Sequence, residues 1–350
     1  METVYFGIIL FLFLLAIFDL VVGVSNDAVN FLSSAVGAKG EPFSVIMWIA
    51  ATGILCGALM SNGMMEIARH GIFRPEQFFF QELVCIFLAV MVTDVLVLDV
   101  FNTLGLPTST TVSMVFELLG GTFALTLVKM AGTEGMHFAD YLNTEKALSV
   151  IMGIFLSVAI AFFFGMVVQW LARLVFTFRY RERLKWTIGL FGGIASTAIV
   201  YFMLIKGVKD TTFMTSGAKA WIAAHGTLIA GCCLVGFTLL MQVLHWLRVN
   251  VFKVVVLLGT FALALAFAGN DLVNFIGVPL AGYDSYLDYA AHGAGSDTYL
   301  MSSLNEPART PFLFLAAAGV IMVWTLCTSK KAQKVIKTSV DLSRQDEGEE

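Results

Sequence analysis

Two copies of one polar cluster interrupt strongly apolar parts of the chain, and this pairing constrains the fold more than any other feature. The first copy covers residues 25–31 (SNDAVNF) and the second covers residues 269–275 (GNDLVNF). In each copy an Asn, an Asp and a second Asn occupy positions i, i+1 and i+4, so the two asparagines share one face of a helix. A carboxylate at the centre of a membrane helix costs roughly 2.5–3.5 kcal/mol. Two copies of so costly a cluster predict a duplicated binding site, and the alternative is two chance polar patches that satisfy neighbouring helices.

The composition restricts the chain to one broad class. Of its 350 residues, 58% are hydrophobic and 13% are charged, whereas a soluble domain carries about 25% charged residues. We therefore predict an all-α, polytopic integral membrane protein in contact with a lipid bilayer and without a nucleic-acid partner. The five cysteines lie in apolar runs without metal-ligand spacing, so we expect no disulfide, no structural metal and no other cofactor.

Nine apolar stretches have the length and composition of membrane helices. They cover residues 4–23, 43–60, 82–104, 107–129, 147–178, 187–205, 220–247, 254 into the second cluster, and 311–328. Residues 23–38 combine Gly, Ser and Asn at membrane depth, which predicts a helix that breaks and restarts there.

This pattern divides the chain into a first repeat, intervening membrane helices, the start of a second repeat and a charged cytoplasmic tail. The four parts cover residues 1–146, 147–250, 251–328 and 329–350. The first repeat contains the broken-helix signature at 23–38 and a hydroxyl-rich element at 105–113. The intervening helices are joined by a basic loop at 179–185.

The distribution of basic residues predicts the orientation. The excess of Lys and Arg in cytoplasmic loops places residues 179–185 and 330–337 in the cytoplasm. Counting spans outward from these anchors puts the N-terminus outside, together with loops 131–146, 206–219 and 283–310. The first cluster is then entered from outside and the second from inside. Inverted repeats with a broken helix in each half are typical of secondary transporters.

The polar residues suit two kinds of ligand. Broken helices offer free N–H groups and a positive dipole end to an anion. Four consecutive hydroxyls, Thr108 to Thr111, add donors directly after Pro107, although an ordinary helix cap is the alternative. The carboxylates Asp27 and Asp271 suit a coupling cation such as Na⁺, with Asn oxygens completing its shell, or they carry a proton.

Three further acids lie at membrane depth and are secondary candidates for a coupling role. They are Asp94, Asp99 and Glu117. The alternative for each is a hydrogen bond to a neighbouring helix or a position nearer the membrane interface.

These motifs resemble those of the inorganic phosphate transporter (PiT) family. Residues 23–30 and 268–274 resemble its duplicated Gly-x-Asn-Asp-x-x-Asn signature, although the first has an extra residue between Gly and Asn. Residues 104–111 resemble its Pro-x-Ser-Thr-Thr element, and residues 64–72 are similar to its linker after the second helix. The resemblance covers most of residues 1–325.

The resemblance implies cation-coupled uptake of phosphate, driven by Na⁺ or H⁺, through a site where the two repeats meet. The residues that line this site by resemblance are Asp27, Asn30, Ser109, Thr110, Thr111, Asp271 and Asn274. Asn26, Thr108 and Asn270 complete the set of substrate-binding candidates.

Two departures from the family pattern concern the second repeat and the coupling ion. Residues 283–350 contain no second Pro-x-Ser-Thr-Thr element, so we expect the chain to lack the end of its second repeat. Val112 stands where the family often has a His, and Phe116-Glu117 stands where it usually has small residues.

Other functions remain as alternatives at this point. Sulfate has the size and shape of phosphate, but it cannot donate a hydrogen bond to a carboxylate at neutral pH, which favours phosphate. An intramembrane hydrolase would use Asp27 and Asp271 as a catalytic dyad, which leaves the inverted repeat unexplained. A membrane subunit without transport activity is the third alternative. We expect a symporter, not an enzyme, that pairs as a homodimer in the plasma membrane, specifically a bacterial inner membrane.

Overall fold

The computed structural model describes residues 2–61, 67–132, 137–177, 180–203, 215–292, 295–306 and 310–343. Within these ranges all regular elements are helices, and strand-like pairing is limited to two isolated bridges. The predicted all-α class is confirmed. Parts of several predicted segments lie outside the described residues, among them 64–66 of the linker, Arg179 of the basic loop, 133–136 of loop 131–146, most of loop 206–219, parts of loop 283–310 and the end of the tail.

Seven helices in the described ranges are long and apolar enough to cross a membrane, as expected for a polytopic integral membrane protein. These candidate spans are Thr3–Ala38, Phe43–Met60, Phe80–Leu104, Thr110–Gly132, Thr144–Phe176, Gly226–Trp246 and Val251–His292. An eighth arises if α12 (Phe312–Thr328) and α13 (Lys330–Leu342), which bend by 65° at their junction, count as one span. The predicted span 187–205 is the apolar part of α7 (Tyr180–Phe202).

The chain forms two compact units. The first unit contains residues 1–33, 62–151 and 270–350, and the second contains residues 34–61 and 152–269. Both polar clusters belong to the first unit, apart from Gly269 at the start of the second cluster. Each unit is therefore described separately, and the first contains the candidate site.

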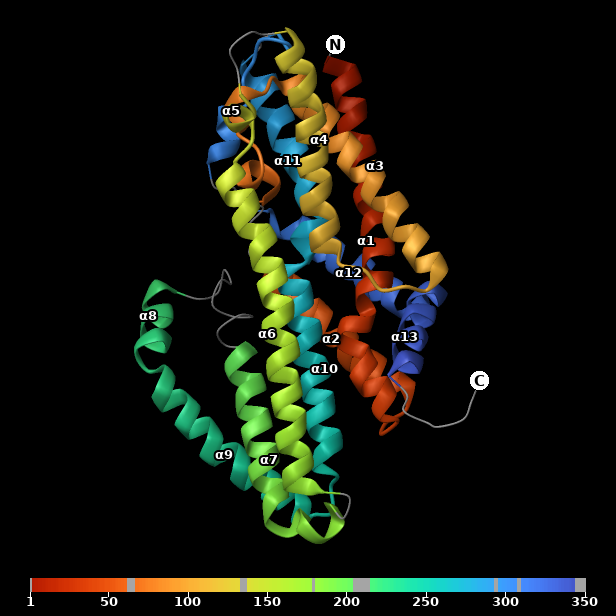
Figure 1. The fold of residues 1–350 in the computed structure, drawn as a ribbon, viewed down its shortest axis with the longest axis vertical. Coiled ribbons are helices and arrows are strands. Elements are labelled where there is room, and N and C mark those ends of the chain that lie inside the picture. The colour runs from red at the N-terminus through yellow and green to blue at the C-terminus, as the bar shows by residue number, and fades with distance from the viewer. Residues whose placement is uncertain are drawn as a thin grey trace. The chain divides into compact units, whose positions relative to one another are not determined.

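Helix α3 (Phe80–Leu104) organises the first unit. It packs against α4 (Thr110–Gly132) and α11 (Leu272–His292), and its C-terminal part contacts α13 (Figure 1). The core holds large aromatic side chains from α3 and from the segment before it, with aliphatic side chains from the first turns of α1 (Glu2–Ala38). Its fully buried members include Leu12, Phe73, Phe78, Phe80 and Phe87.

Two pairs of closely packed helices lie in the second unit. Helix α7 packs along α9 (Gly226–Trp246), as Figure 1 shows. Gly53 and Gly57 of α2 (Phe43–Met60) face the backbone of α10 (Val251–Asn270), where an added Cβ would lie 2.7 Å and 2.2 Å from the carbonyl oxygens of Phe261 and Leu265. Small residues one turn apart are the usual means of such close contact between membrane helices.

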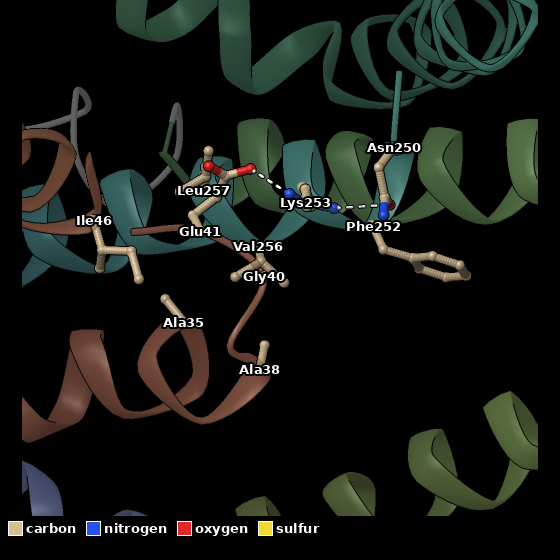
Figure 2. A pocket seen from close by; sticks show the side chains of 10 residues that line it. All are labelled: Ala35, Ala38, Gly40, Glu41, Ile46, Asn250, Phe252, Lys253, Val256 and Leu257. Carbon is tan, nitrogen blue, oxygen red and sulfur yellow. Dashed lines mark hydrogen bonds and ion pairs between the residues drawn. The ribbon is translucent and has the colours of Figure 1, made fainter. Parts of the chain in front are cut away.

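The second unit also contains a small pocket of about 150 Å³, which Figure 2 shows from close by. An ion pair of 3.0 Å between Glu41 and Lys253 closes one side of it. The other lining side chains are mostly apolar, and the lining includes none of the predicted site residues. We therefore look for the site in the first unit.

Two predicted features of the polar clusters have different outcomes. The break expected over residues 23–38 does not occur, because α1 is one continuous helix from Glu2 to Ala38. Its polar side chains find partners while the helix continues: the Ser25 hydroxyl donates to the Val21 carbonyl one turn earlier, and Asp27 accepts from Thr110 of α4. In the second cluster α10 ends at Asn270 and α11 begins at Leu272, so Asp271 does interrupt the helix.

The charged tail predicted over residues 329–350 is helical over most of its described part. Residues Lys330–Leu342 form the amphipathic helix α13, whose Ala332, Val335 and Ile336 are buried. The Ser329 and Ser25 hydroxyls lie 2.7 Å apart, and the Lys334 ammonium donates to the Thr103 carbonyl. Apolar residues spaced three and four apart explain why this segment packs on the bundle.

Gly23 permits a close contact between the two polar clusters. An added Cβ at Gly23 would lie 2.1 Å from the ring of Phe275, which is fully buried. We expect Gly23→Ala to lower the free energy of unfolding by roughly 1–3 kcal/mol, because the ring has no free space to enter. Thermal unfolding of the purified full chain in detergent measures this.

Gly7→Ala is the matched control, because Gly7 lies in the same helix and its added Cβ meets no atom within 4 Å. Its melting temperature should be unchanged or higher, since Ala favours a helix over Gly by about 1 kcal/mol. Equal melting temperatures for Gly23→Ala and the unmodified chain would contradict the contact.

Candidate functional site

The candidate site lies where two helices begin side by side. Helix α4 starts at Thr110, with Ser109 capping it through a 3.3 Å hydrogen bond from the Val112 N–H. Helix α11 starts directly after Asp271. The Asn274 amide donates to the Thr111 hydroxyl oxygen at 2.8 Å, which joins the first turns of the two helices. The first turn of α4, with its positive dipole end, and the first turn of α11 thus meet in one place.

Asp27 adds a buried carboxylate to this place. It is only 3% exposed, and it accepts hydrogen bonds from the Thr110 hydroxyl at 2.8 Å and from the Asn30 amide at 3.3 Å. Asp271 is half-buried, and its charge is close enough to interact with that of Asp27. Among the described ion pairs none includes either carboxylate. Two acids without a basic partner are a plausible place for a cation.

Asn26 has a different role from the one predicted for it. Its amide donates to the Asn102 side-chain oxygen at 2.8 Å and to the Leu106 carbonyl at 3.1 Å, and its oxygen accepts from the Thr108 N–H at 2.7 Å. Asn102 in turn donates to the Val22 carbonyl. Both asparagines are completely buried. Asn26 therefore holds the loop before α4 and has no donor left for a substrate.

The backbone of that loop is set by the end of α3. Gly105 has φ 77°, a left-handed conformation that glycine adopts without strain. The N–H groups of Gly105 and Leu106 donate to the carbonyls of Asn102 and Phe101, which closes the helix. The chain then turns through Pro107 into the hydroxyl-rich element.

Several predicted donors remain available. The oxygens of Ser109 and Thr111 each accept a hydrogen bond, which leaves their own O–H groups free to donate. Ser109 is exposed and Thr111 is half-buried, as is Thr108. Asn30 and Asn270 are exposed. Hydroxyls and helix N-termini are the kind of donors that bind an oxyanion without a permanent buried cation.

The secondary acids separate into two groups. Asp99 is nearly half exposed and forms a 2.5 Å ion pair with Lys331 of α13, which removes it from the site. Asp94 and Glu117 both contact the Ser113 hydroxyl, one turn further along α4 from Thr110. They form a second acidic cluster, the first being the pair Asp27 and Asp271.

The sequence analysis missed two residues that the structure brings to this region. Asn102 and Asp19 are both completely buried polar residues within apolar spans. The same signal that drew attention to Asp94, a polar side chain at membrane depth, would have identified them.

Comparison with known proteins identifies the family of this chain. The sequence model of the phosphate transporter family matches residues 23–339. No sequence among curated proteins matches the chain. A solved structure described as the sodium-dependent phosphate transporter aligns with a TM-score of 0.68 and 18% identity, covering 96% of this chain and 78% of that one. At this identity the likeness concerns the fold.

Replacing Asn26 tests its role in holding the loop. Asn26→Ala removes the partners of the Thr108 N–H, the Asn102 oxygen and the Leu106 carbonyl, so we expect a loss of roughly 3 kcal/mol in unfolding free energy. Asn30→Ala in the same helix should cost under about 1 kcal/mol, since Asn30 is exposed.

A double-mutant cycle with Asn102→Ala sharpens this test. Because the two side chains bond directly, their effects should be coupled by about 1–2 kcal/mol. Additive effects, or equal losses in the Asn26 and Asn30 variants, would show that Asn26 does not hold the loop.

Proposed function

This chain belongs to the phosphate transporter family, and from that premise we propose that it carries inorganic phosphate across a membrane together with a coupling cation. The observation that supports this most strongly is the joined start of α4 and α11 next to a buried carboxylate. Thr111 bonds to Asn274, and the neighbouring Thr110 bonds to Asp27. A proposed anion donor, Thr111, thus directly follows the residue that bonds to the proposed cation ligand Asp27.

In the proposed anion site, phosphate accepts hydrogen bonds from the free hydroxyls of Ser109 and Thr111 and from the first N–H groups of the two helices. Thr108 and the exposed amides of Asn30 and Asn270 are further donors within the same region. Such charge-assisted hydrogen bonds are the stronger kind, and they need no buried Lys or Arg.

In the proposed cation site, Na⁺ or H⁺ binds at Asp27 and Asp271, with the amide oxygen of Asn274 or of Asn30 as an added ligand for Na⁺. Each carboxylate would repel phosphate, by about 4 kcal/mol per pair of unit charges at 4 Å and an effective dielectric constant of 20. A cation that neutralises the carboxylates removes this repulsion. Phosphate therefore binds well only after the cation, which couples the two movements.

The proposal also covers the membrane in which the chain lies and the side that each end faces. Four lysines of α13, at positions 330, 331, 334 and 337, follow the last apolar helix. Their concentration supports a cytoplasmic α13 and an N-terminus outside, in the plasma membrane of a bacterium. Pairing of two copies into a homodimer is part of the same proposal.

Uptake of radiolabelled phosphate into proteoliposomes that hold the full chain tests the proposed function. We expect uptake under an inward Na⁺ or H⁺ gradient and its loss in Asp27→Asn, because the neutral amide cannot hold the cation. Thr111→Val should weaken phosphate binding by roughly 10–100-fold, the value of a hydrogen bond to a charged group.

Thr52→Val is the matched control, because Thr52 is an exposed hydroxyl that donates only within α2, to the Trp48 carbonyl. Its uptake should equal that of the unmodified chain. Unlabelled phosphate should compete with the label, and unlabelled sulfate should not. Uptake that survives Asp27→Asn, or that sulfate suppresses equally, would overturn this assignment.

A further inference from the structure

The second acidic cluster contains more acceptors than donors. It consists of Asp19 in α1, Asp94 in α3, and Ser113 and Glu117 in α4. The Ser113 hydroxyl oxygen lies 2.8 Å from an oxygen of Asp94 and 2.8 Å from an oxygen of Glu117. A hydroxyl has one proton, so it can donate to only one of the two carboxyls. The other carboxyl can bond to Ser113 only if it carries a proton itself.

Asp19 gives separate evidence for a protonated carboxyl in this cluster. It is completely buried, and neither of its carboxyl oxygens receives a hydrogen bond from a described donor. The carboxyl of Asp94 is a neighbour of it. Two carboxyl groups bond to each other only when one of them is protonated, as in a carboxyl dyad that shares one proton.

Among the described residues no basic side chain forms an ion pair with this cluster. The charged groups that face Asp19 are Asp94, Glu117 and Asp27, all of them acids. The described ion pairs of Arg69, Lys129 and Lys331 are with other acids, Asp284, Glu82 and Asp99. Three ionised carboxylates in this position would be buried charges without partners, which is strongly unfavourable.

The ligand that this cluster fits is a proton. Within the described residues no three acidic, His or Cys side chains are arranged to hold a metal ion. Two carboxyls joined through a hydroxyl, with a third buried carboxyl as a neighbour, are instead an arrangement in which protons are shared.

A cavity of about 490 Å³ adjoins the Glu117 end of this cluster. It lies between α3 and α4, and its lining includes Ser113, Glu117, Gly120 and Gly121. No atom lies within 4 Å of a Cβ added at Gly120, so the cavity is open beside Glu117. Asp19 lies at the other, fully enclosed end of the cluster.

We propose that Asp19, Asp94, Ser113 and Glu117 form a buried proton-binding relay, separate from the site at Asp27. A proton that enters from the side of the cavity protonates Glu117. Ser113 then accepts that proton while its own hydroxyl proton passes to Asp94, and Asp94 shares it with Asp19. The net change is one proton moved from the cavity to the enclosed end. This proton would also make phosphate uptake depend on pH, a consequence that rests on the proposed function.

Infrared spectroscopy of the purified full chain tests the relay without any transport. At about pH 7, where exposed carboxyls are ionised, we expect a carbonyl band from protonated carboxyl groups. Asp19→Asn and Glu117→Gln should each reduce this band. Glu145→Gln, which alters an exposed acid at the start of α6 (Thr144–Phe176), should leave it unchanged. Absence of the band, or a band that the relay variants do not change, would overturn the proposal.

Ser113→Ala is the second variant, and it keeps all three acids in place. It removes the hydroxyl that joins Asp94 to Glu117, so the carbonyl band should shift in frequency while the acids remain. An unshifted band in a folded Ser113→Ala protein, judged by thermal unfolding, would also count against the relay.

Phosphate uptake at different external pH values separates this inference from the proposed function. We expect uptake by the unmodified chain to vary about tenfold between about pH 6 and pH 8 as the relay gains and loses its proton. Asp19→Asn should flatten this dependence while phosphate still binds. A chain that shows the band but takes up no phosphate would support the relay and refute the transport proposal. Uptake that keeps the same pH dependence in Asp19→Asn would refute the relay.

Discussion

A polar group inside an apolar helix bundle has to find its partner within the bundle, and the first unit of this chain is arranged around that requirement. Asn26 satisfies it with three hydrogen bonds that reach across to α3 and to the loop before α4. Those bonds fix where α4 begins. Because the start of α4 carries Thr110 and Thr111, the geometry of the whole site depends on this one side chain.

The same requirement explains why cation and anion ligands are neighbours. The Thr110 hydroxyl satisfies Asp27, and the Thr111 hydroxyl accepts from Asn274 one residue later. A change in the charge of Asp27 therefore acts directly on the turn that offers donors to an anion. Coupling between two ligands needs a differential interaction of this kind, and adjacent residues on one helical turn provide it.

Much of the candidate site could be predicted from the sequence, because acids and amides at membrane depth are rare and costly. The residues of the two clusters and of the hydroxyl-rich element do meet in the structure. Their individual roles could not be predicted. Asn26 and Asn30 share a helix face by their spacing, yet Asn26 is completely buried and Asn30 is exposed. Helical periodicity predicts the direction in which a side chain points from the helix axis, but it does not predict whether other residues lie in that direction.

The sequence by itself determined the class of the protein, its membrane helices and the pair of clusters that mark the site, since hydrophobic content and unpaired polar residues are local properties. The tertiary structure alone decided which partner each polar group found. It kept α1 continuous through residues 23–38, paired Asp99 with Lys331, and brought Asp19 to Asp94. These outcomes depend on contacts between residues far apart in the chain, where packing selects one partner among several of equal chemistry.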